Sequence, residues 1–382
     1  MNGITSAFTS TSEVEEGVGL RPSVERRHFH TFDALRCFAF LKVFFYHIPI
    51  AYPAAFVYLK AGGDIAVRFF FVLSGFLITY LIVAEKKRNG CLNFKRYFVR
   101  RALRIWPLYY LMVAFAFSTP FILSRLNLDQ SNQGYQPNFL FTIAFLENYV
   151  GIATREAPNV SPLGVMWSLC VEEHFYIVWG GILYFLDTRH LPKLILGSLT
   201  LSIISRIVFV ALGYPTLDLL TNLDLFALGA LPAYLLLERR DKFERAVKNL
   251  HAGVKISYIA VVILITLVAP HVRGPVVEVL APTALGVLFA GLLAIFLPSQ
   301  TTFGISDNNV FSKLGIYTYG LYLYHTIVIN GLMQLFRRAG LPLELPAYGI
   351  LFIASALGVS IGISMLSYRY FEKPFLALKR YA

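Results

Sequence analysis

The chain has 382 residues, of which 57% are hydrophobic and only 15% are charged. This balance excludes an ordinary soluble enzyme and indicates a protein whose solvent is largely lipid. The formal charge of +12 would suggest a nucleic-acid partner in a soluble protein, but in a membrane protein the basic excess usually lies in cytoplasmic loops.

Ten apolar segments are long enough to cross a bilayer core, which is roughly 30 Å thick and needs about 20 residues of helix. In chain order they cover 32–52, 64–84, 104–124, 167–186, 194–213, 218–237, 254–270, 276–297, 314–333 and 347–366. The sequence therefore predicts an all-α integral membrane protein, a bundle of about ten transmembrane helices around an intramembrane polar cavity.

The distribution of basic residues predicts the orientation of these segments. If the N-terminus is cytoplasmic, most of the 34 Lys and Arg residues fall in cytoplasmic connections and tails. The basic residues of the outer connections are Lys60, Arg125, Arg155, Arg273, Arg337 and Arg338. This asymmetry predicts a multi-pass protein of a bacterial inner membrane with both termini cytoplasmic, and it removes the reason to expect nucleic acid.

The chain divides into three predicted regions. Residues 1–30 are polar, Ser/Thr-rich and then basic, without the apolar stretch of a signal peptide, which predicts a disordered cytoplasmic tail. Residues 31–376 form the membrane domain and 377–382 a second cytoplasmic tail. The three cysteines have unrelated spacings and predict neither a disulfide framework nor a metal site.

One outer connection is long, from about 125 to 166, and it contains the apolar stretch PNFLFTIAFLENYV at 137–150. This stretch is too short to span a bilayer. It predicts either a re-entrant or interfacial helix over the mouth of a cavity, or an inert amphipathic loop.

Several ionisable residues lie within the predicted spans, where a central Arg, Lys or Asp costs about 2.5 to 3.5 kcal/mol. We expect them to face a polar interior, which is the candidate site. They are Arg36, Lys42, Arg68, Glu172, Glu173, Arg206 and Asp224, with His47 and His325 beside them.

Arg36 and His47 are eleven residues apart, a spacing that returns to nearly the same helix face three turns later. Asp33 precedes Arg36 by three residues. His47 then lies in the outer half of the bilayer, where its imidazole is a candidate base. The alternative is a histidine satisfied by a neighbouring helix.

Glu172 and Glu173 open the fourth span and point about 100° apart, so each needs its own partner. One is expected to pair with an intramembrane arginine, and the other to carry a proton or orient His47. Ser168 and Tyr176 lie on the Glu172 face at four-residue spacing. The alternative is a capped helix entry near the outer surface.

Two further patterns suit an elongated anionic ligand. Ser74 and Gly75 form a small pair that admits a neighbouring backbone or a narrow ligand. Arg101 and Arg104 share a helix face at the membrane boundary marked by Trp106, and paired guanidinium groups suit phosphate. The alternatives are plain helix packing for the first pattern, and a topology signal or an anionic-lipid site for the second.

The order of motifs resembles the membrane-bound acyltransferase-3 family, which O-acylates lipopolysaccharide, other glycans, Nod factors and some macrolides. The resemblance extends from about 31 to 376. The motifs are FDALRCFAFLKVFFYH at 32–47, GGDIAVRFFFVLSGFLIT at 62–79, RRALRIWPLYY at 100–110, WSLCVEEHFYIVW at 167–179, NLDLFALGAL at 222–231, LGIYTYGLYLYH at 314–325 and SYRYFEKPF at 367–375. Arg68 and Met166 depart from the usual family pattern.

The resemblance implies transfer of an acyl group, chiefly acetyl, from cytoplasmic acyl-CoA to a hydroxyl of a glycan or glycolipid-like acceptor, without a metal. It places the catalytic function on His47, Arg36, Glu172 and Glu173, with a transient acyl-histidine as the alternative to general-base catalysis. The implied donor site comprises Arg101, Arg104, Phe70, Ser74 and Gly75, and the implied acceptor site comprises Trp167, Ser168, Tyr322 and His325.

Two other functions are compatible with buried charge in a bundle. One is a polytopic transporter or sensor, which broken helices in paired halves would favour, and the sequence displays no such repeat. The other is a non-catalytic relative that binds acyl-CoA, and the presence of Arg36, His47 and both glutamates argues against it. The acceptor, the acyl length and the oligomeric state are not encoded in a pattern we can read.

Overall fold

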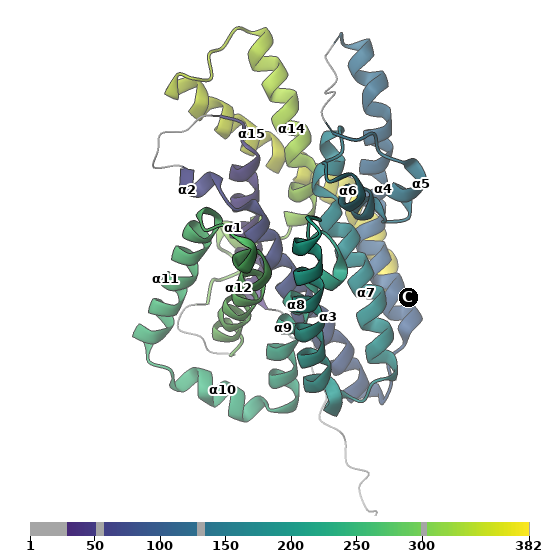
Figure 1. Ribbon diagram of the computed structural model, residues 1–382, viewed down its shortest axis with the longest axis vertical. Helices are drawn as coiled ribbons and strands as arrows, with labels where there is room; N and C mark the ends of the chain where they lie inside the picture. Colours follow the sequence, from purple (N-terminus) through teal and green to yellow (C-terminus); the bar gives the residue numbers. More distant parts are fainter. Residues whose placement is uncertain (1–28, 51–56, 128–133, 299–303, 382) are drawn as a thin grey trace, which may run out of the picture.

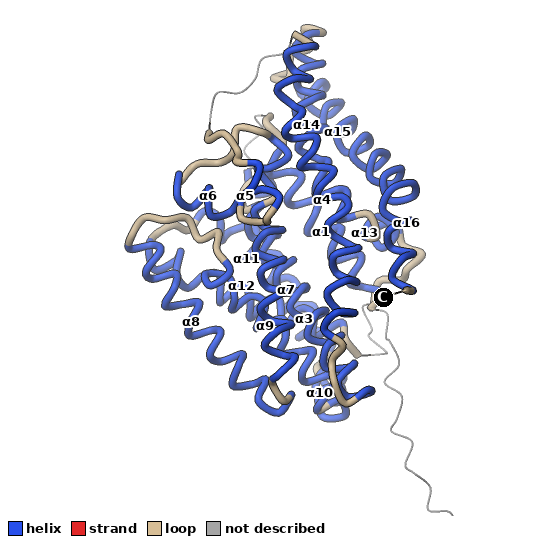
Figure 2. Tube along the Cα trace, turned by 90° about the vertical axis from the view of Figure 1, so that its right-hand side faces the viewer, coloured by secondary structure: helices blue, strands red, loops and turns tan. Residues whose placement is uncertain are grey.

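A computed structural model describes residues 29–50, 57–127, 134–298 and 304–381, which form a bundle of helices (Figures 1 and 2). Most of the predicted N-terminal tail lies outside these ranges. Within them, β structure is limited to one isolated bridge between Tyr135 and Pro158, so the all-α prediction is confirmed. The helices are α1 (His30–His47), α2 (Val57–Lys60), α3 (Gly63–Asn89), α4 (Phe94–Arg125), α5 (Phe139–Ile143), α6 (Glu147–Thr154), α7 (Trp167–Phe185), α8 (Leu191–Ala211), α9 (Leu219–Glu238), α10 (Arg240–Asn249), α11 (Ala252–Val268), α12 (Pro275–Phe296), α13 (Val310–Gly315), α14 (Thr318–Arg338), α15 (Pro346–Ser367) and α16 (Lys373–Ala377).

A long helix lies at each of the ten predicted spans, the shortest being α11 with 17 residues. In the described part of the chain, seven of these helices are long and apolar enough to cross a membrane. The remaining three, α1, α7 and α14, are the ones that carry the candidate histidines and glutamates. Their polar side chains lower the hydropathy that marks a span.

Connections that were predicted on the same side of the membrane contact one another. At one end of the bundle, Lys86 in the last turn of α3 donates to the Leu183 carbonyl of α7 (2.8 Å), and Lys87 pairs with Glu238 of α9 (3.0 Å). At the other end, Arg338, the last residue of α14, donates to the carbonyl of Leu126 after α4 (3.0 Å). The alternation of the helices therefore agrees with the basic-residue pattern.

Helices α3 and α9 form the centre of the bundle (Figure 1) and pack backbone to backbone. A Cβ atom added to Gly75 would lie 2.0 Å from the Phe226 carbonyl oxygen, and one added to Gly229 would lie 1.9 Å from the Val72 carbonyl oxygen. No side chain fits in either place. The two glycines thus allow the close approach of α3 and α9, as small residues do in membrane bundles.

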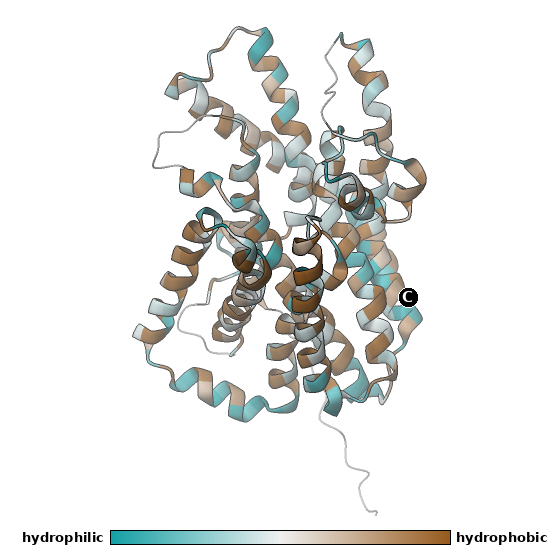
Figure 3. Ribbon diagram, viewed as in Figure 1, coloured by the Kyte–Doolittle hydropathy of each residue, from teal (hydrophilic) through white to brown (hydrophobic). Residues whose placement is uncertain are grey.

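Helix α10 runs across the ends of α9 and α11 (Figure 1). Colouring by hydropathy shows α8, α11 and α12 as mainly hydrophobic and α10 as mainly hydrophilic (Figure 3). Of the residues on α10, only Val247 is buried. This arrangement is typical of an interfacial helix, with the apolar helices exposed to lipid.

The apolar stretch at 137–150 forms α5 and α6, separated by a turn in which Phe145 has φ 59°. Tyr109 of α4 donates to the Thr142 carbonyl (2.7 Å) and its ring stacks on Phe145 with centroids 3.9 Å apart. Tyr109 precedes the end of α4 at Arg125 by sixteen residues, about 24 Å of helix. These contacts favour a re-entrant segment over an inert outer loop.

Candidate active site

Three cavities follow one another along α3. The basic cavity has a volume of about 420 Å³, the central cavity about 140 Å³ and the histidine cavity, named for His47, about 470 Å³. Arg101 lines both the basic and the central cavity, while Val67 and Tyr322 line both the central and the histidine cavity. The lining residues of α3 run from Gly63 to Arg88, about 37 Å of helix, which is enough to cross a bilayer core.

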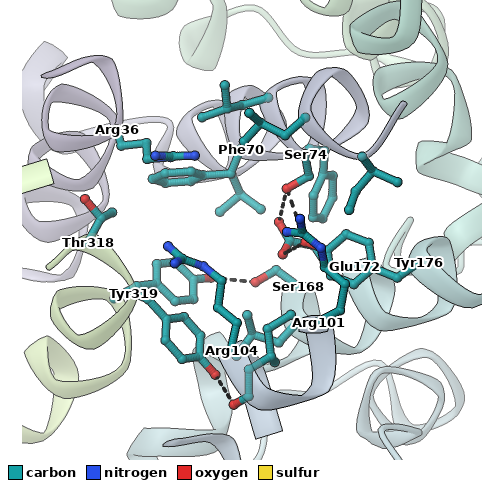
Figure 4. Close-up of a pocket in the computed structure, with 18 of the residues that line it drawn as sticks. Arg36, Phe70, Ser74, Arg101, Arg104, Ser168, Glu172, Tyr176, Thr318 and Tyr319 are labelled. Carbon is teal, nitrogen blue, oxygen red and sulfur yellow. Dashed lines mark hydrogen bonds between the residues drawn. The ribbon is translucent and has the colours of Figure 1, made fainter. Parts of the chain in front are cut away.

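The central cavity brings three predicted arginines together (Figure 4). Arg36 enters from α1, Arg101 and Arg104 enter from α4, and the carboxylate of Glu172 from α7 also lines the cavity. Arg36 also forms an ion pair with Asp33, one turn earlier on the same helix. Three cations and one anion line this space, so the cavity suits an anionic ligand.

Glu172 and Glu173 have separate partners, as the 100° between them predicted. Glu172 accepts hydrogen bonds from Ser74 (3.0 Å) and Tyr176 (2.9 Å) and lines the central cavity. Glu173 accepts one from the Trp106 indole (2.6 Å). The expected hydrogen bond between a glutamate and His47 is not formed in this structure, because α7 presents Glu172 to α3 and Glu173 to α4.

The candidate donor residues of α3 have two different locations: two line the central cavity, and one packs against a neighbouring helix. Phe70 and Ser74 lie one turn apart on the face of α3 that lines the central cavity (Figure 4). Gly75 lies on the other side of the helix, against the Phe226 carbonyl. The expectation that Gly75 borders the donor is therefore corrected: it is a helix-packing residue, and only the neighbouring serine reaches the cavity.

The two intramembrane histidines contact each other. His325 Nε2 lies 3.2 Å from His47 Nδ1, and the ring centroids are 4.9 Å apart. His47 lines the histidine cavity, whereas His325 is fully buried behind it. The sequence placed Arg36 on the helix face of His47 and left a partner from a neighbouring helix as the alternative. It did not identify His325 as that partner, because 278 residues separate the two rings in the chain.

The candidate acceptor residues lie on both sides of the boundary at Tyr322. Trp167 lines the histidine cavity, whereas Ser168 lines the central cavity and bonds to the Tyr322 hydroxyl (2.7 Å). Sequence reasoning missed further polar lining residues of the histidine cavity. These are Asp64, Ser161, Thr326 and Asn330, of which Asn330 bonds to Ser161 (2.7 Å).

The basic cavity also contains residues that the motifs did not indicate. Arg88 comes from the end of α3 and Arg100 from α4, and the chain after α16 adds Lys379 and Arg380. Lys379 lies within electrostatic range of Arg100, Arg101 and Arg104. The only sequence signal for this cavity was that both segments are basic. The preference of cytoplasmic connections for basic residues already accounted for that signal.

Arg206 and Asp224 do not belong to the site, contrary to the expectation for intramembrane charges. Arg206 of α8 and Asp224 of α9 form a double hydrogen-bonded ion pair (2.9 and 2.7 Å) in which both side chains are fully buried. Thr283 of α12 bonds to both partners. Neither charge lines any of the three cavities along α3. Each of the two charges is therefore neutralised by the other and not by a polar cavity.

Two other intramembrane charges are satisfied locally. Arg68, which departs from the resemblance, pairs with Asp64 one turn earlier (3.1 Å), and Lys42 donates to the Tyr58 carbonyl (2.8 Å). Across the described ranges, no three His, Cys, Asp or Glu side chains are grouped as metal ligands would be.

The chain matches the model of a known protein family. The model of the acyltransferase domain of type 3 matches residues 29–366, which is most of the chain. The chain belongs to the acyltransferase-3 family. All seven motifs, from α1 to the segment after α15, lie within or directly after the matched region.

Curated relatives share this region. The peptidoglycan O-acetyltransferase OatA of Listeria monocytogenes is 31% identical over 204 residues, covering 50% of this chain and 30% of that protein. A Staphylococcus aureus protein provisionally named an O-acetyltransferase is 25% identical over 367 residues, covering 91% of this chain and 57% of its own. This chain therefore spans only part of the length of these relatives. No solved structure matches the chain significantly.

Proposed function

We propose that this acyltransferase moves an acetyl group from acetyl-CoA, bound from the cytoplasm, to a hydroxyl of a glycan on the outer side of a bacterial inner membrane. The observation that carries the proposal is the succession of three cavities along α3, joined by Arg101 at one boundary and by Val67 and Tyr322 at the other. A cytoplasmic donor and an outer acceptor require a path of this kind.

The donor end of the path is basic. An acyl-CoA carries several phosphates on its nucleotide, and the arginines of the basic and central cavities match that charge. Arg101 and Arg104 would hold phosphate, and the narrow central cavity beside Phe70 and Ser74 would hold the pantetheine arm. The carboxylate of Glu172, held by hydrogen bonds from Ser74 and Tyr176, would be the polar group facing that arm.

The acceptor end combines aromatic and polar groups. Trp167 and Tyr46 offer ring faces, and Asp64, Ser161 and Asn330 offer hydrogen-bonding groups. This mixture suits a carbohydrate, which presents apolar ring faces and many hydroxyls. The relative from Listeria monocytogenes is named a peptidoglycan O-acetyltransferase, and we take a peptidoglycan-type glycan as the acceptor to test first.

His47 is the proposed base because it lines the histidine cavity, which shares Val67 and Tyr322 with the central cavity. It would accept the proton of the acceptor hydroxyl as that oxygen attacks the thioester carbonyl. The C–S bond then breaks, and the leaving thiolate takes the proton from His47, so charge and atoms balance.

The test is acetyl transfer by purified protein in proteoliposomes, with radiolabelled acetyl-CoA and soluble peptidoglycan fragments on opposite sides. We expect labelled glycan to accumulate only when the donor has access to the face that carries Arg88 and Lys379. Transport of acetyl-CoA or fragment without a labelled product would favour the transporter interpretation. Donor binding with no transfer to any glycan would favour a non-catalytic relative.

Replacing Arg101 or Arg104 with alanine is expected to weaken acetyl-CoA binding by roughly 10- to 100-fold, because each removes a charge-assisted hydrogen-bonding group from a poorly hydrated cavity. Isothermal titration with purified protein measures this loss. The matched control is Arg240→Ala, since Arg240 is an exposed basic residue of α10 paired with Glu244. Equal affinities for all three variants would leave the arginine pair with a topological role only.

The proposed orientation can be tested with cysteines. Cys91 is exposed in the connection between α3 and α4, and Cys37 and Cys170 are buried. Ala339 is exposed at the end of α14. A membrane-impermeant maleimide added to spheroplasts is expected to label Ala339→Cys strongly and Cys91 only after lysis. Labelling of Cys91 in intact spheroplasts would show that the protein has the opposite orientation in the membrane.

A further inference from the structure

The buried histidine beside His47 is the feature of the site that the proposed function leaves without a role. His325 is fully buried and lines none of the three cavities along α3. Its ring packs edge-on against Phe40 with centroids 5.8 Å apart. Because it is enclosed, it does not touch a substrate held in the histidine cavity.

The hydrogen bonds of the pair fix which ring nitrogens carry protons. His325 Nδ1 lies 2.8 Å from the Tyr322 carbonyl oxygen, and His47 Nδ1 lies 2.9 Å from the Val43 carbonyl oxygen. A carbonyl oxygen only accepts, so both Nδ1 atoms carry hydrogen. His325 Nε2 is then unprotonated, and it accepts from the His47 Nδ1 hydrogen, which is shared between Val43 and His325.

The same reasoning gives the protonation state of the other ring nitrogen of His47, Nε2. With hydrogen on Nδ1, the neutral His47 ring holds its lone pair on Nε2. No hydrogen bond joins that atom to another described residue, and the residue lines the histidine cavity. Nε2 of His47 is therefore the nitrogen available to a substrate hydroxyl.

We propose that His325 is a positioning residue that holds His47 in the Nδ1-protonated tautomer and accepts a hydrogen bond from its Nδ1 throughout the reaction. This inference rests on the proposed function of His47 as base. When His47 Nε2 takes the hydroxyl proton, the ring becomes an imidazolium whose Nδ1 hydrogen still points at His325 Nε2. A neutral imidazole thus fills the position that a carboxylate occupies in a Ser-His-Asp triad.

The experiment compares three replacements of His325. In His325→Gln the amide oxygen reaches about as far as Nε2 does and can accept from His47. In His325→Asn the same amide is one methylene shorter and falls short of that nitrogen. His325→Leu is apolar and accepts nothing. Turnover and KM for the glycan are measured for each, with acetyl-CoA affinity and melting temperature as folding controls.

We expect kcat to fall roughly 10- to 100-fold in the Asn and Leu variants, the loss of one hydrogen bond to a group that becomes charged. KM for the glycan should change by less than about threefold, because the interaction matters in the transition state rather than in binding. The Gln variant should recover most of the turnover. A role in packing alone would not separate Gln from Asn in kcat.

The double variant His47→Ala/His325→Leu completes the test. If His325 acts through His47, the double variant turns over no more slowly than His47→Ala alone. Full turnover of the Asn and Leu variants, equal loss in Gln and Asn, or a change confined to KM would overturn the proposal. If the Leu variant does not fold, the Gln and Asn pair still decides. Normal turnover of His47→Ala would instead refute the assignment of the base.

Discussion

Replacing His47 with alanine is expected to lower the rate of acetyl transfer by at least about two orders of magnitude, since general-base catalysis contributes typically 10² to 10⁴ in rate. Binding of acetyl-CoA should persist, because the arginines that would hold the donor lie in the central and basic cavities and not beside His47. Single-turnover transfer and donor titration on the same preparation separate the two effects.

The matched control for this prediction is His174→Ala. His174 also lies within an intramembrane helix, stacks on Tyr149 with centroids 5.6 Å apart, and lines none of the three cavities along α3. We expect it to retain most of the transfer activity. His325 is unsuitable as the control, because it contacts His47. Unchanged turnover in His47→Ala would mean that another group takes the proton.

Replacing Arg206 with alanine is expected to destabilise the protein by about 3 to 5 kcal/mol, because Asp224 would remain as an uncompensated buried charge. Arg206 uses all three guanidinium nitrogens, including a bond from Nε to the Val279 carbonyl (2.8 Å), so α9 and α12 both lose a hydrogen-bonding partner on α8. Thermal unfolding in detergent should show a large fall in the melting temperature.

The companion variant is Arg206→Met/Asp224→Leu, which removes both charges and keeps much of the volume. We expect it to be clearly more stable than either single replacement, since an apolar pair no longer requires desolvation of an ion. A double variant as unstable as Arg206→Ala would show that the hydrogen bonds to Thr283 and the backbone matter more than charge balance. Transfer activity of the folded double variant should remain, because neither residue lines the path.

The positions of the helices were predictable because the thickness of a bilayer fixes the length of an apolar segment. The separate partners of Glu172 and Glu173 were predictable for a similar reason, since the helical repeat places adjacent side chains about 100° apart. Local geometry also placed Tyr176 next to Glu172, four residues earlier. These inferences use distances along one helix, which the sequence defines.

Relations between helices were the part that the sequence could not define. The intramembrane charges indicated that polar partners must exist. They did not indicate that Arg206 pairs with Asp224 and that neither residue lines the cavity. Similarly, Ser74 and Gly75 are adjacent, and only the position of α9 decides that Gly75 packs on Phe226 while Ser74 faces the cavity. The rotation and neighbours of each helix follow from packing of the whole bundle.

The polar composition of α1, α7 and α14 has a consequence for how the protein is made. Each of these helices enters the membrane with side chains that lipid disfavours, at about 2.5 to 3.5 kcal/mol for a central charge. Their stable insertion is then expected to rely on apolar partner helices, and α3 contacts both α1 and α7. Substitutions that make α1 more apolar, such as Arg36→Leu, should raise the amount of inserted protein while removing a charge from the central cavity. Biogenesis and chemistry therefore place opposite demands on the same side chains.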